Sequence, residues 1–159
     1  MTKVVFKIPK IWQARIHYAD LAKQFSENSN PSPEDIFLAV CKIRTHKLPD
    51  PKVIGNAGSF FQNPIVPVEQ YETLLKTHAG LVSYPDVAGK RKLAAGWLID
   101  QCGFKGQRMG NVGVYANQAL VLVNHGGGTA QDILGLAKCI QDKVRAEFGI
   151  TLQIEPNIF

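Results

Sequence analysis

The sequence predicts an α+β fold, a mixed sheet packed by helices, preceded by a separate amino-terminal part. In several stretches, apolar residues recur at the three-and-four spacing of one helical face. Between them lie short stretches rich in β-branched and aromatic residues, which are typical of strands. Pro49 and Pro51 interrupt this series, and the elements after them suffice for a layered core of their own. We therefore expect two parts, with a boundary near these prolines.

The first predicted element is a strand at residues 3–8. These residues alternate weakly between polar and apolar and are rich in β-branched side chains, and Pro9 ends the pattern. No hairpin partner is evident for this strand. Because an unpaired terminal strand is only marginally stable in water, we expect the first ~30 residues to be weakly attached to the rest of the fold.

A helix follows from about Pro33 to His46. Ser32 supplies the N-cap, Pro33 the first-turn proline and Asp35 an acidic residue in the first turn. The helix is expected to bury one apolar face, formed by Ile36, Phe37, Val40 and Ile43.

The part after Pro51 contains a series of short elements. The expected elements are, in order, a Gly/Asn turn at 55–58, a strand at 59–61, a helix at about 68–78, a strand near 81–84, a helix at 92–102, and strands near 112–115 and 119–124. Gly103 is expected to end the second of these helices.

The last part of the chain predicts a long helix and a final strand. Thr129 and Asp132 form a capping-box pattern, and Gly149 is placed to cap the carboxyl end. The helical face between them consists of Ile133, Leu136, Ala137, Ile140, Val144 and Phe148. Residues 150–154 alternate apolar and polar side chains, so they predict a strand.

Composition excludes several classes of protein. With 159 residues, 45% hydrophobic and 19% charged, the chain is typical of a globular protein. The formal charge of +5 comes from dispersed Lys and Arg, which predicts a solvated surface with a mild preference for anions and no nucleic acid as partner. The longest apolar run, residues 119–123, is far shorter than the roughly 20 residues of a membrane span. We expect a cytoplasmic protein without a membrane partner.

The three cysteines do not predict a disulfide framework or a metal site. Cys41, Cys102 and Cys139 are odd in number, lack CxxC spacing and lie within apolar helical patterns. We expect them to be buried reduced thiols, with no bound metal.

Two glycine-rich segments could carry chemistry. In the first, residues 52–64, small residues would let a ligand approach the backbone, and Ser59 offers one hydroxyl. The pattern alone favours a structural turn over a ligand loop, since no nucleophile elbow or paired histidine accompanies the serine. The second segment, residues 126–128, lacks the spacing of a phosphate-binding motif, and we interpret it as a turn.

Three blocks, residues 48–52, 55–64 and 92–103, resemble the MurB family of UDP-N-acetylenolpyruvoylglucosamine reductases, in the same order. Residues 118–124 and the closing Glu155-Pro156 also match, so the resemblance covers nearly the whole chain. It implies a fold like the carboxy-terminal domain of that family, with an amino-terminal remnant of the FAD-binding region.

The resemblance implies a reaction and two catalytic residues. In the family, reduced FAD transfers a hydride to the enolpyruvyl double bond of UDP-N-acetylglucosamine enolpyruvate. NADPH then reduces the flavin again. The product is UDP-N-acetylmuramate for peptidoglycan. Ser59 matches the proton donor, and Glu155 matches the group that stabilises the enol intermediate. From the sequence pattern alone, a solvated carboxylate at a strand end explains Glu155 better.

The resemblance also implies contacts to the UDP portion of the substrate. Lys47, Asn63, Lys105 and Gln118 match these positions, and their cationic and amide donors suit phosphate and uracil oxygens. Ordinary surface lysines remain the alternative for Lys47 and Lys105. Trp97 could be mistaken for a uracil platform, but its helix is otherwise apolar toward the core, so we expect it to pack there.

Two further residues fall on the flavin side. The resemblance implies cofactor contacts for Gly58 and Arg44, although a solvated arginine at a helix carboxyl end explains Arg44 equally well. FAD and NADPH belong to the intact enzyme of the family, and we expect neither to be bound to this chain. We expect the region that holds most of the flavin to have no counterpart in this sequence.

These implications define the expected domains and partners. Residues 1–48 are expected to be a remnant of the FAD-binding region and residues 49–159 the substrate-binding domain. The chain alone is expected to be inactive without an amino-terminal FAD domain as partner. The alternative is a stand-alone UDP-sugar binding module without redox activity. We also expect an apolar patch at Val5, Phe6 and Ile8, with self-association through the free strand edge.

Overall fold

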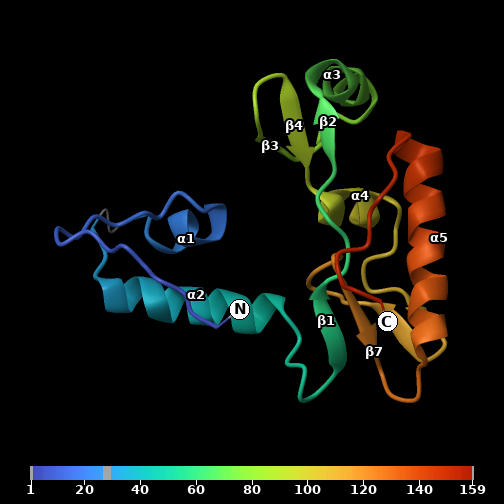
Figure 1. Cartoon of the computed structure of the whole chain (residues 1–159), viewed down its shortest axis with the longest axis horizontal. Helices are drawn as coiled ribbons and strands as arrows, with labels where there is room; N and C mark the ends of the chain where they lie inside the picture. The colour runs from blue at the N-terminus through green and yellow to red at the C-terminus, as the bar shows by residue number, and fades with distance from the viewer. Residues whose placement is uncertain (1, 27–29, 159) are drawn as a thin grey trace. The chain divides into compact units, whose positions relative to one another are not determined.

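The computed structural model of the chain describes residues 2–26 and 30–158. The chain forms two compact units, Met1–His46 and Lys47–Phe159, and each is described by itself (Figure 1). No helix in the described ranges is both long and apolar enough to cross a membrane.

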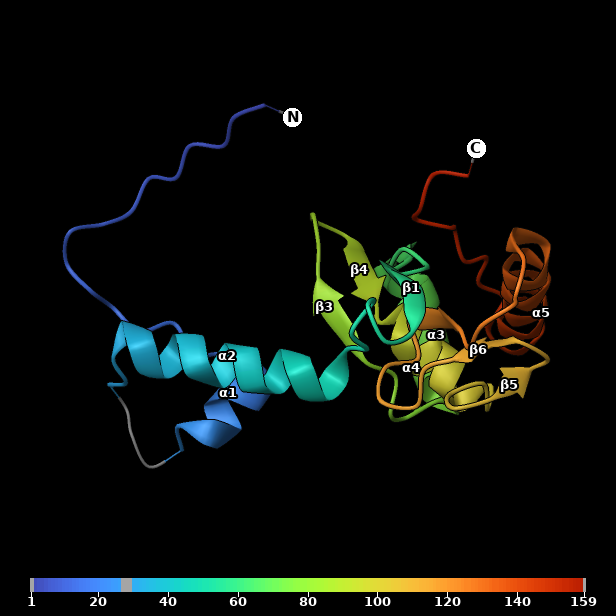
Figure 2. The same cartoon turned by 90° about the horizontal axis from the view of Figure 1, so that it is seen from below.

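The first unit contains two helices and a long segment without regular secondary structure. Helix α1 spans Ala19–Gln24 and helix α2 spans Pro33–Lys47, and the two lie side by side in both views (Figures 1 and 2). Among the residues described, this unit buries little apolar surface: Leu21, Pro31 and Ala39. Trp12 ties the preceding segment to this unit, because its Nε1 donates to the Pro31 carbonyl at 3.3 Å.

The predicted strand at residues 3–8 is wrong. These residues belong to no strand, and Val5, Phe6 and Ile8 are 80%, 79% and 81% exposed. A strand needs a neighbour for its backbone hydrogen bonds, and the unit supplies none among its described residues. The predicted free strand edge is therefore absent, although the three apolar side chains are exposed as expected.

The predicted helix at 33–46 is confirmed, with one difference in its packing. Ser32 Oγ accepts from Asp35 N at 3.1 Å and Asp35 Oδ2 accepts from Ser32 N at 3.0 Å, which is the capping box expected. The hydrogen bonds from the Ser32 hydroxyl and then from its backbone N–H lower the pKa of Asp35. The expected burial of its apolar face is wrong, however: Phe37 is 65% exposed, and Ile36, Val40 and Ile43 are only half-buried. Ala39 is the buried residue of this helix.

The second unit contains two antiparallel sheets. In the first sheet, the order is β1-β7-β6-β5, formed by Gly55–Ser59, Val121–Asn124, Val112–Val114 and Arg108–Met109. In the second, the order is β2-β4-β3, formed by Ile65–Pro67, Lys90–Leu93 and Ser83–Pro85.

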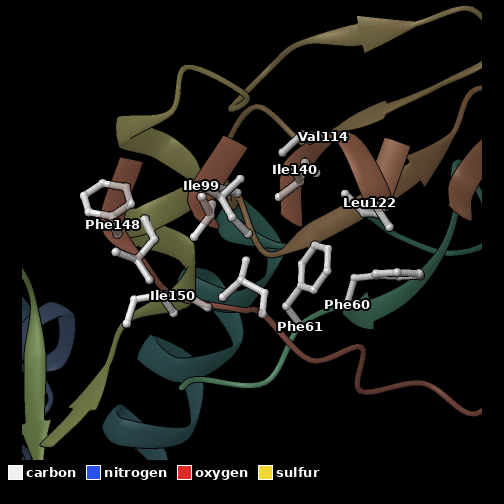
Figure 3. Packing of buried hydrophobic residues seen from close by; sticks show 14 of the residues in the cluster. Phe60, Phe61, Ile99, Val114, Leu122, Ile140, Phe148 and Ile150 are labelled. Atoms are coloured by element: carbon white, nitrogen blue, oxygen red, sulfur yellow. The ribbon is translucent and has the colours of Figure 1, made fainter. Parts of the chain in front are cut away.

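Three helices pack on these sheets, which confirms the α+β class. Helix α3 (Val68–Thr77) lies against β2 and β4, whereas α5 (Ala130–Phe148) lies against β6, β7 and the short α4 (Ala95–Gln101) (Figure 1). The core between them includes Phe60, Phe61, Leu93, Leu98, Ile99, Leu122, Ile140, Val144, Phe148 and Leu152 (Figure 3). Trp97 packs against this core as expected, with its ring centroid 5.9 Å from that of Phe148.

Helix α5 agrees with its prediction at both ends. Thr129 and Asp132 form the capping box, and Gly149 takes a left-handed φ of 66° after the last turn. Helix α3 also agrees within one residue of the expected 68–78.

Several other predicted elements differ from the structure. Residues 55–58 are not a turn but part of strand β1. This strand ends at Ser59, where the strand expected at 59–61 would begin. Strand β3 begins two residues later than the strand expected near 81. The expected helix at 92–102 starts only at Ala95, because Lys90–Leu93 pairs as the central strand of the second sheet. Of the expected strand at 150–154, only Ile154 makes a bridge, with Phe61.

The cysteines are reduced, but the expected burial is wrong. Cys41 and Cys139 are exposed and Cys102 is half-buried. Cys139 precedes the inward-facing Ile140 on α5, so it falls on the solvent side of the helix. Burial is the main cause that raises the pKa of Cys102. The residues that the structure describes include no cluster of three or more metal-ligating side chains.

Candidate functional site

Ser59 lies at the end of β1, directly after an irregularity in the strand. Asn56 pairs with Val123 and Ser59 with Val121, so three steps along β1 correspond to two steps along β7. This is the geometry of a β-bulge, which re-aims the side chains that follow it. Ser59 is exposed.

The backbone brings Glu155 next to Ser59. Phe60 N donates to the Leu120 carbonyl at 2.8 Å, and Glu155 N donates to the Phe60 carbonyl at 3.0 Å. Residue 60 therefore lies between two segments, 118–121 and 153–155. The Phe60 and Phe61 rings are buried and pack edge to face at 5.4 Å, which anchors this stretch in the core (Figure 3).

Gln118 belongs to the same arrangement. Its Oε1 accepts from Leu120 N at 3.3 Å, and the Leu120 carbonyl in turn accepts from Phe60 N. Its Oε1 also lies close to Gly96, where an added Cβ would approach it to 3.2 Å. The structure thus brings together the backbone around three of the predicted site residues, Ser59, Gln118 and Glu155.

Asn63 lies three residues beyond Phe60 and holds the start of α4. Its Oδ1 accepts from Ala95 N at 2.9 Å, which satisfies a helix amide that has no partner inside the helix. It also lines a hollow of about 270 Å³, formed by Gln62, Asn63, Pro64, Ile65, Thr151 and Gln153. Asn63 and Gln118 therefore both lie at the first turn of α4.

The sheet next to Asn63 exposes a mixed polar and apolar face that the sequence patterns do not predict. Ile65, Lys92 and Tyr84 are direct register partners across β2, β4 and β3, so their side chains share one face. Ile65 and Tyr84 are 50% and 51% exposed. Lys92 Nζ lies 3.2 Å from Asp86 Oδ2. The hydrogen bond from Val87 N and the one from Lys92 lower the pKa of Asp86.

The sequence does contain a signal for this face. Residues 90–92, Lys-Arg-Lys, fall partly within the helix expected at 92–102, and consecutive residues do not share one face of a helix. The alternation of a strand places Lys90 and Lys92 together and turns Arg91 to the other side, toward Tyr71, whose ring centroid lies 5.0 Å from Arg91 Cζ.

Lys105 lies apart from this group. It follows the carboxyl end of α4, and its Nζ lies 3.4 Å from Asp100 Oδ2 in an exposed ion pair. Asn63 and Gln118 lie at the other end of this helix, roughly 10 Å away by the rise of its residues. The structure therefore does not bring Lys105 into contact with them.

The two remaining basic residues lie on α2. Lys47 is its last residue and is half-buried in the second unit, whereas Arg44 is exposed in the first unit. A contact of Arg44 with a flavin stays a prediction.

The glycine-rich segment 126–128 is a turn, as interpreted from the sequence. Asn124 Oδ1 accepts from Gly126 N and from Gly128 N, both at 3.0 Å, and Asn124 Nδ2 donates to the Gly128 carbonyl. These two amides are therefore already bonded. In addition, the carboxylate of Asp132 lies at the start of α5, where it would repel a phosphate.

Comparison with known proteins gives a consistent result. Residues 50–159 match a family model described as "UDP-N-acetylenolpyruvoylglucosamine reductase, C-terminal domain". A protein of that name from Polynucleobacter asymbioticus is 84% identical over 99% of this chain. Others from Ralstonia nicotianae and Paraburkholderia xenovorans are 52% and 49% identical over 99% and 98% of the chain. The chain spans 46%, 47% and 46% of the length of these three relatives.

Proposed function

The chain belongs to the family of the C-terminal domain of UDP-N-acetylenolpyruvoylglucosamine reductase, and we propose that it is the substrate-binding part of such an enzyme. The proposed enzyme is a cytoplasmic oxidoreductase that converts UDP-N-acetylglucosamine enolpyruvate to UDP-N-acetylmuramate in peptidoglycan synthesis. The observation that carries the proposal is the backbone ladder that places Glu155 beside the Ser59–Phe60 stretch, within the region that matches the family.

Ser59 is proposed to give the proton to the substrate. A serine hydroxyl is a poor acid in water, so it can serve only against a strongly basic enolate-like intermediate held in the right geometry. Glu155 is proposed to stabilise the carboxylate side of that intermediate, directly or through water. Both residues are exposed, and the bridge between Phe61 and Ile154 keeps their segments adjacent, which supports access of both to one ligand.

Asn63, Gln118 and Lys92 are proposed to bind the UDP portion. The side-chain oxygens of Asn63 and Gln118 already accept backbone N–H groups, so their amide nitrogens remain as donors for phosphate or uracil oxygens. Lys92 supplies a cation on the adjacent sheet face. Lys47 and Lys105 retain their proposed roles as further cationic contacts.

FAD would supply the hydride in the proposed enzyme, and NADPH would reduce the flavin. Gly58 fits a contact with a flavin ring, since no heavy atom beyond its two chain neighbours lies within 4 Å of the position that its Cβ would take. The glycine-rich turn is a poor binding site for the pyrophosphate of FAD, because the Gly126 and Gly128 amides already donate to Asn124. We therefore propose that the isolated chain is inactive and that a separate FAD domain holds most of the cofactor.

A titration of the purified chain with UDP-N-acetylglucosamine enolpyruvate, followed by nitrogen-proton NMR, tests the proposal. We expect shifts at Ser59, Asn63 and Gln118, and no flavin uptake when FAD and NADPH are added. In the whole reductase, Ser59→Ala should remove turnover but keep substrate binding. Micromolar binding of UDP ligands by the chain, together with a dispensable Ser59, would instead favour the stand-alone binding module.

A further inference from the structure

The Asn56 side chain holds the bulge before Ser59. Asn56 Oδ1 accepts from Gly58 N at 3.1 Å, two residues along the chain. Its Nδ2 donates to the Ile54 carbonyl at 3.0 Å, and the Pro49 carbonyl lies at 3.5 Å. The amide of Asn56 therefore ties the bulge to the segment that leads into β1, in the manner of an Asx turn.

Gly58 is the point at which the direction of the backbone is set. Its φ is +73°, a left-handed conformation that a side chain would strain, although the space around it is open. The φ and ψ angles of Gly58 determine where the next residue, Ser59, presents its hydroxyl. The hydrogen bond from Gly58 N to Asn56 is the side-chain contact that opposes a change in these angles.

We propose that Asn56 is a positioning residue for Ser59. By holding Gly58 in its left-handed conformation, the Asn56 side chain aims the Ser59 hydroxyl at the carbon that receives the proton. This inference rests on the proposed function, because it concerns the same reaction.

Asn124 offers a matched control. It lies in the same ladder, where it pairs with Gly55, and its amide also holds a glycine turn through hydrogen bonds to Gly126 and Gly128. Its bonds lead away from Ser59, toward the start of α5. If the role of Asn56 were only structural, then Asn56→Ala and Asn124→Ala variants of equal stability would have equal kinetics.

The first experiment measures the kinetics of the whole reductase that contains this chain. We expect Asn56→Ala to lower kcat about tenfold to a hundredfold, because small errors in the position of a reacting group have such effects. KM should change little, and the solvent deuterium isotope effect on kcat should rise, since the transfer from Ser59 becomes slower. Asn56→Asp keeps the acceptor for Gly58 N and should retain more turnover than Asn56→Ala. An isotope effect unchanged from wild type in Asn56→Ala, or raised equally in Asn124→Ala, would overturn the inference.

The second experiment does not depend on turnover. Amide hydrogen exchange in the purified chain should show Gly58 N–H protected in wild type and in Asn56→Asp, but not in Asn56→Ala. Equal exchange in all three would show that Asn56 does not hold the bulge. If the protection behaves as expected but Ser59→Ala keeps full turnover, then the proposed function fails while Asn56 still fixes the bulge.

Discussion

Side-chain amides hold the backbone around the candidate site. The oxygens of Asn56, Asn63 and Gln118 each accept a backbone N–H, from Gly58, Ala95 and Leu120 respectively. An amide has both an acceptor and two donors, so a residue that fixes a loop with its oxygen can still donate to a ligand. The same side chains can therefore serve structure and binding together.

Substitution of Asn63 separates these two roles. Asn63→Ala should lose about 1 kcal/mol of stability, because Ala95 N loses its acceptor. Asn63→Asp keeps an acceptor for that amide, so thermal unfolding followed by circular dichroism should give a Tm close to wild type. Both variants lose the donor, so NMR titration should show weaker binding of UDP. The loss should be larger in the Asn63→Asp variant, because the new carboxylate repels the phosphates.

Two outcomes would contradict this prediction for Asn63. If Asn63→Asp were as unstable as Asn63→Ala, the contact with Ala95 would not support α4. If Asn63→Asp bound UDP as tightly as wild type, the amide nitrogen would have no part in binding. Gln70→Asp, an exposed change on α3, controls for the added charge.

Single residues were predictable from the sequence only where a motif carried them. Ser59, Asn63, Gln118 and Glu155 entered through a family resemblance, and for Ser59 and Glu155 the sequence pattern alone favoured plainer explanations. No local pattern points to Lys92 together with Tyr84, since they lie eight residues apart and meet only through the pairing of β3 with β4. Such a pairing is a tertiary property that a local pattern does not contain.

At the scale of elements, the helices with capping boxes were predicted well. Both α2 and α5 have local start signals, Ser32 with Asp35 and Thr129 with Asp132, and the structure uses all four side chains as expected. The sequence predicts a turn where the structure has most of strand β1, because glycine and asparagine are rare in strands. Pairing with the buried β7 outweighs this local preference.

The capping box of α5 predicts a dependence of stability on pH. The backbone N–H of Thr129, and then its hydroxyl, lower the pKa of Asp132 from its ordinary value of 3.8. A carboxyl group whose pKa is lower in the folded state than in the unfolded state stabilises the fold. This stabilisation is complete above the unfolded-state pKa and is lost as the pH falls through the folded-state pKa. The box should therefore support α5 at neutral pH and fail in acid.

Urea unfolding at a series of pH values measures this effect. At neutral pH, Asp132→Asn should unfold at a lower urea concentration than wild type, and the difference should disappear below the folded pKa of Asp132. Glu147→Gln, near the other end of α5, is the control for loss of one negative charge. A difference between Asp132→Asn and wild type that persists unchanged in acid would contradict the prediction.

At the scale of the whole molecule, the two units contribute unequally to the core. The core cluster lies entirely in the second unit, whereas the first unit buries only Leu21, Pro31 and Ala39 among the apolar residues described. Since burial of apolar surface drives folding, residues 47–159 should fold alone, with a Tm close to that of the whole chain. Residues 1–46 alone should show no cooperative transition in circular dichroism. If residues 47–159 alone were unfolded, the first unit would be needed for the stability of the second, and the prediction would be wrong.

The exposed apolar side chains of the first unit predict self-association. Val5, Phe6 and Ile8 are each about four-fifths exposed, at 80%, 79% and 81%, and exposed apolar side chains so close in sequence favour contact with another molecule. Because residues 3–8 belong to no strand, we attribute the contact to the side chains rather than to a strand edge. Sedimentation velocity should show a sedimentation coefficient that rises with concentration.

Substitutions distinguish association through these side chains from nonspecific association. Phe6→Ser combined with Ile8→Ser should restore a monomer, because the change removes two of these three exposed apolar side chains without touching the core. Val53→Ser, at a side chain that is 84% exposed in the second unit, should leave association unchanged, since that residue lacks a comparable run of apolar neighbours in sequence. A wild-type chain that stays monomeric at all concentrations would refute the prediction. If the association persists in the double variant but disappears in residues 47–159, another part of the first unit carries it.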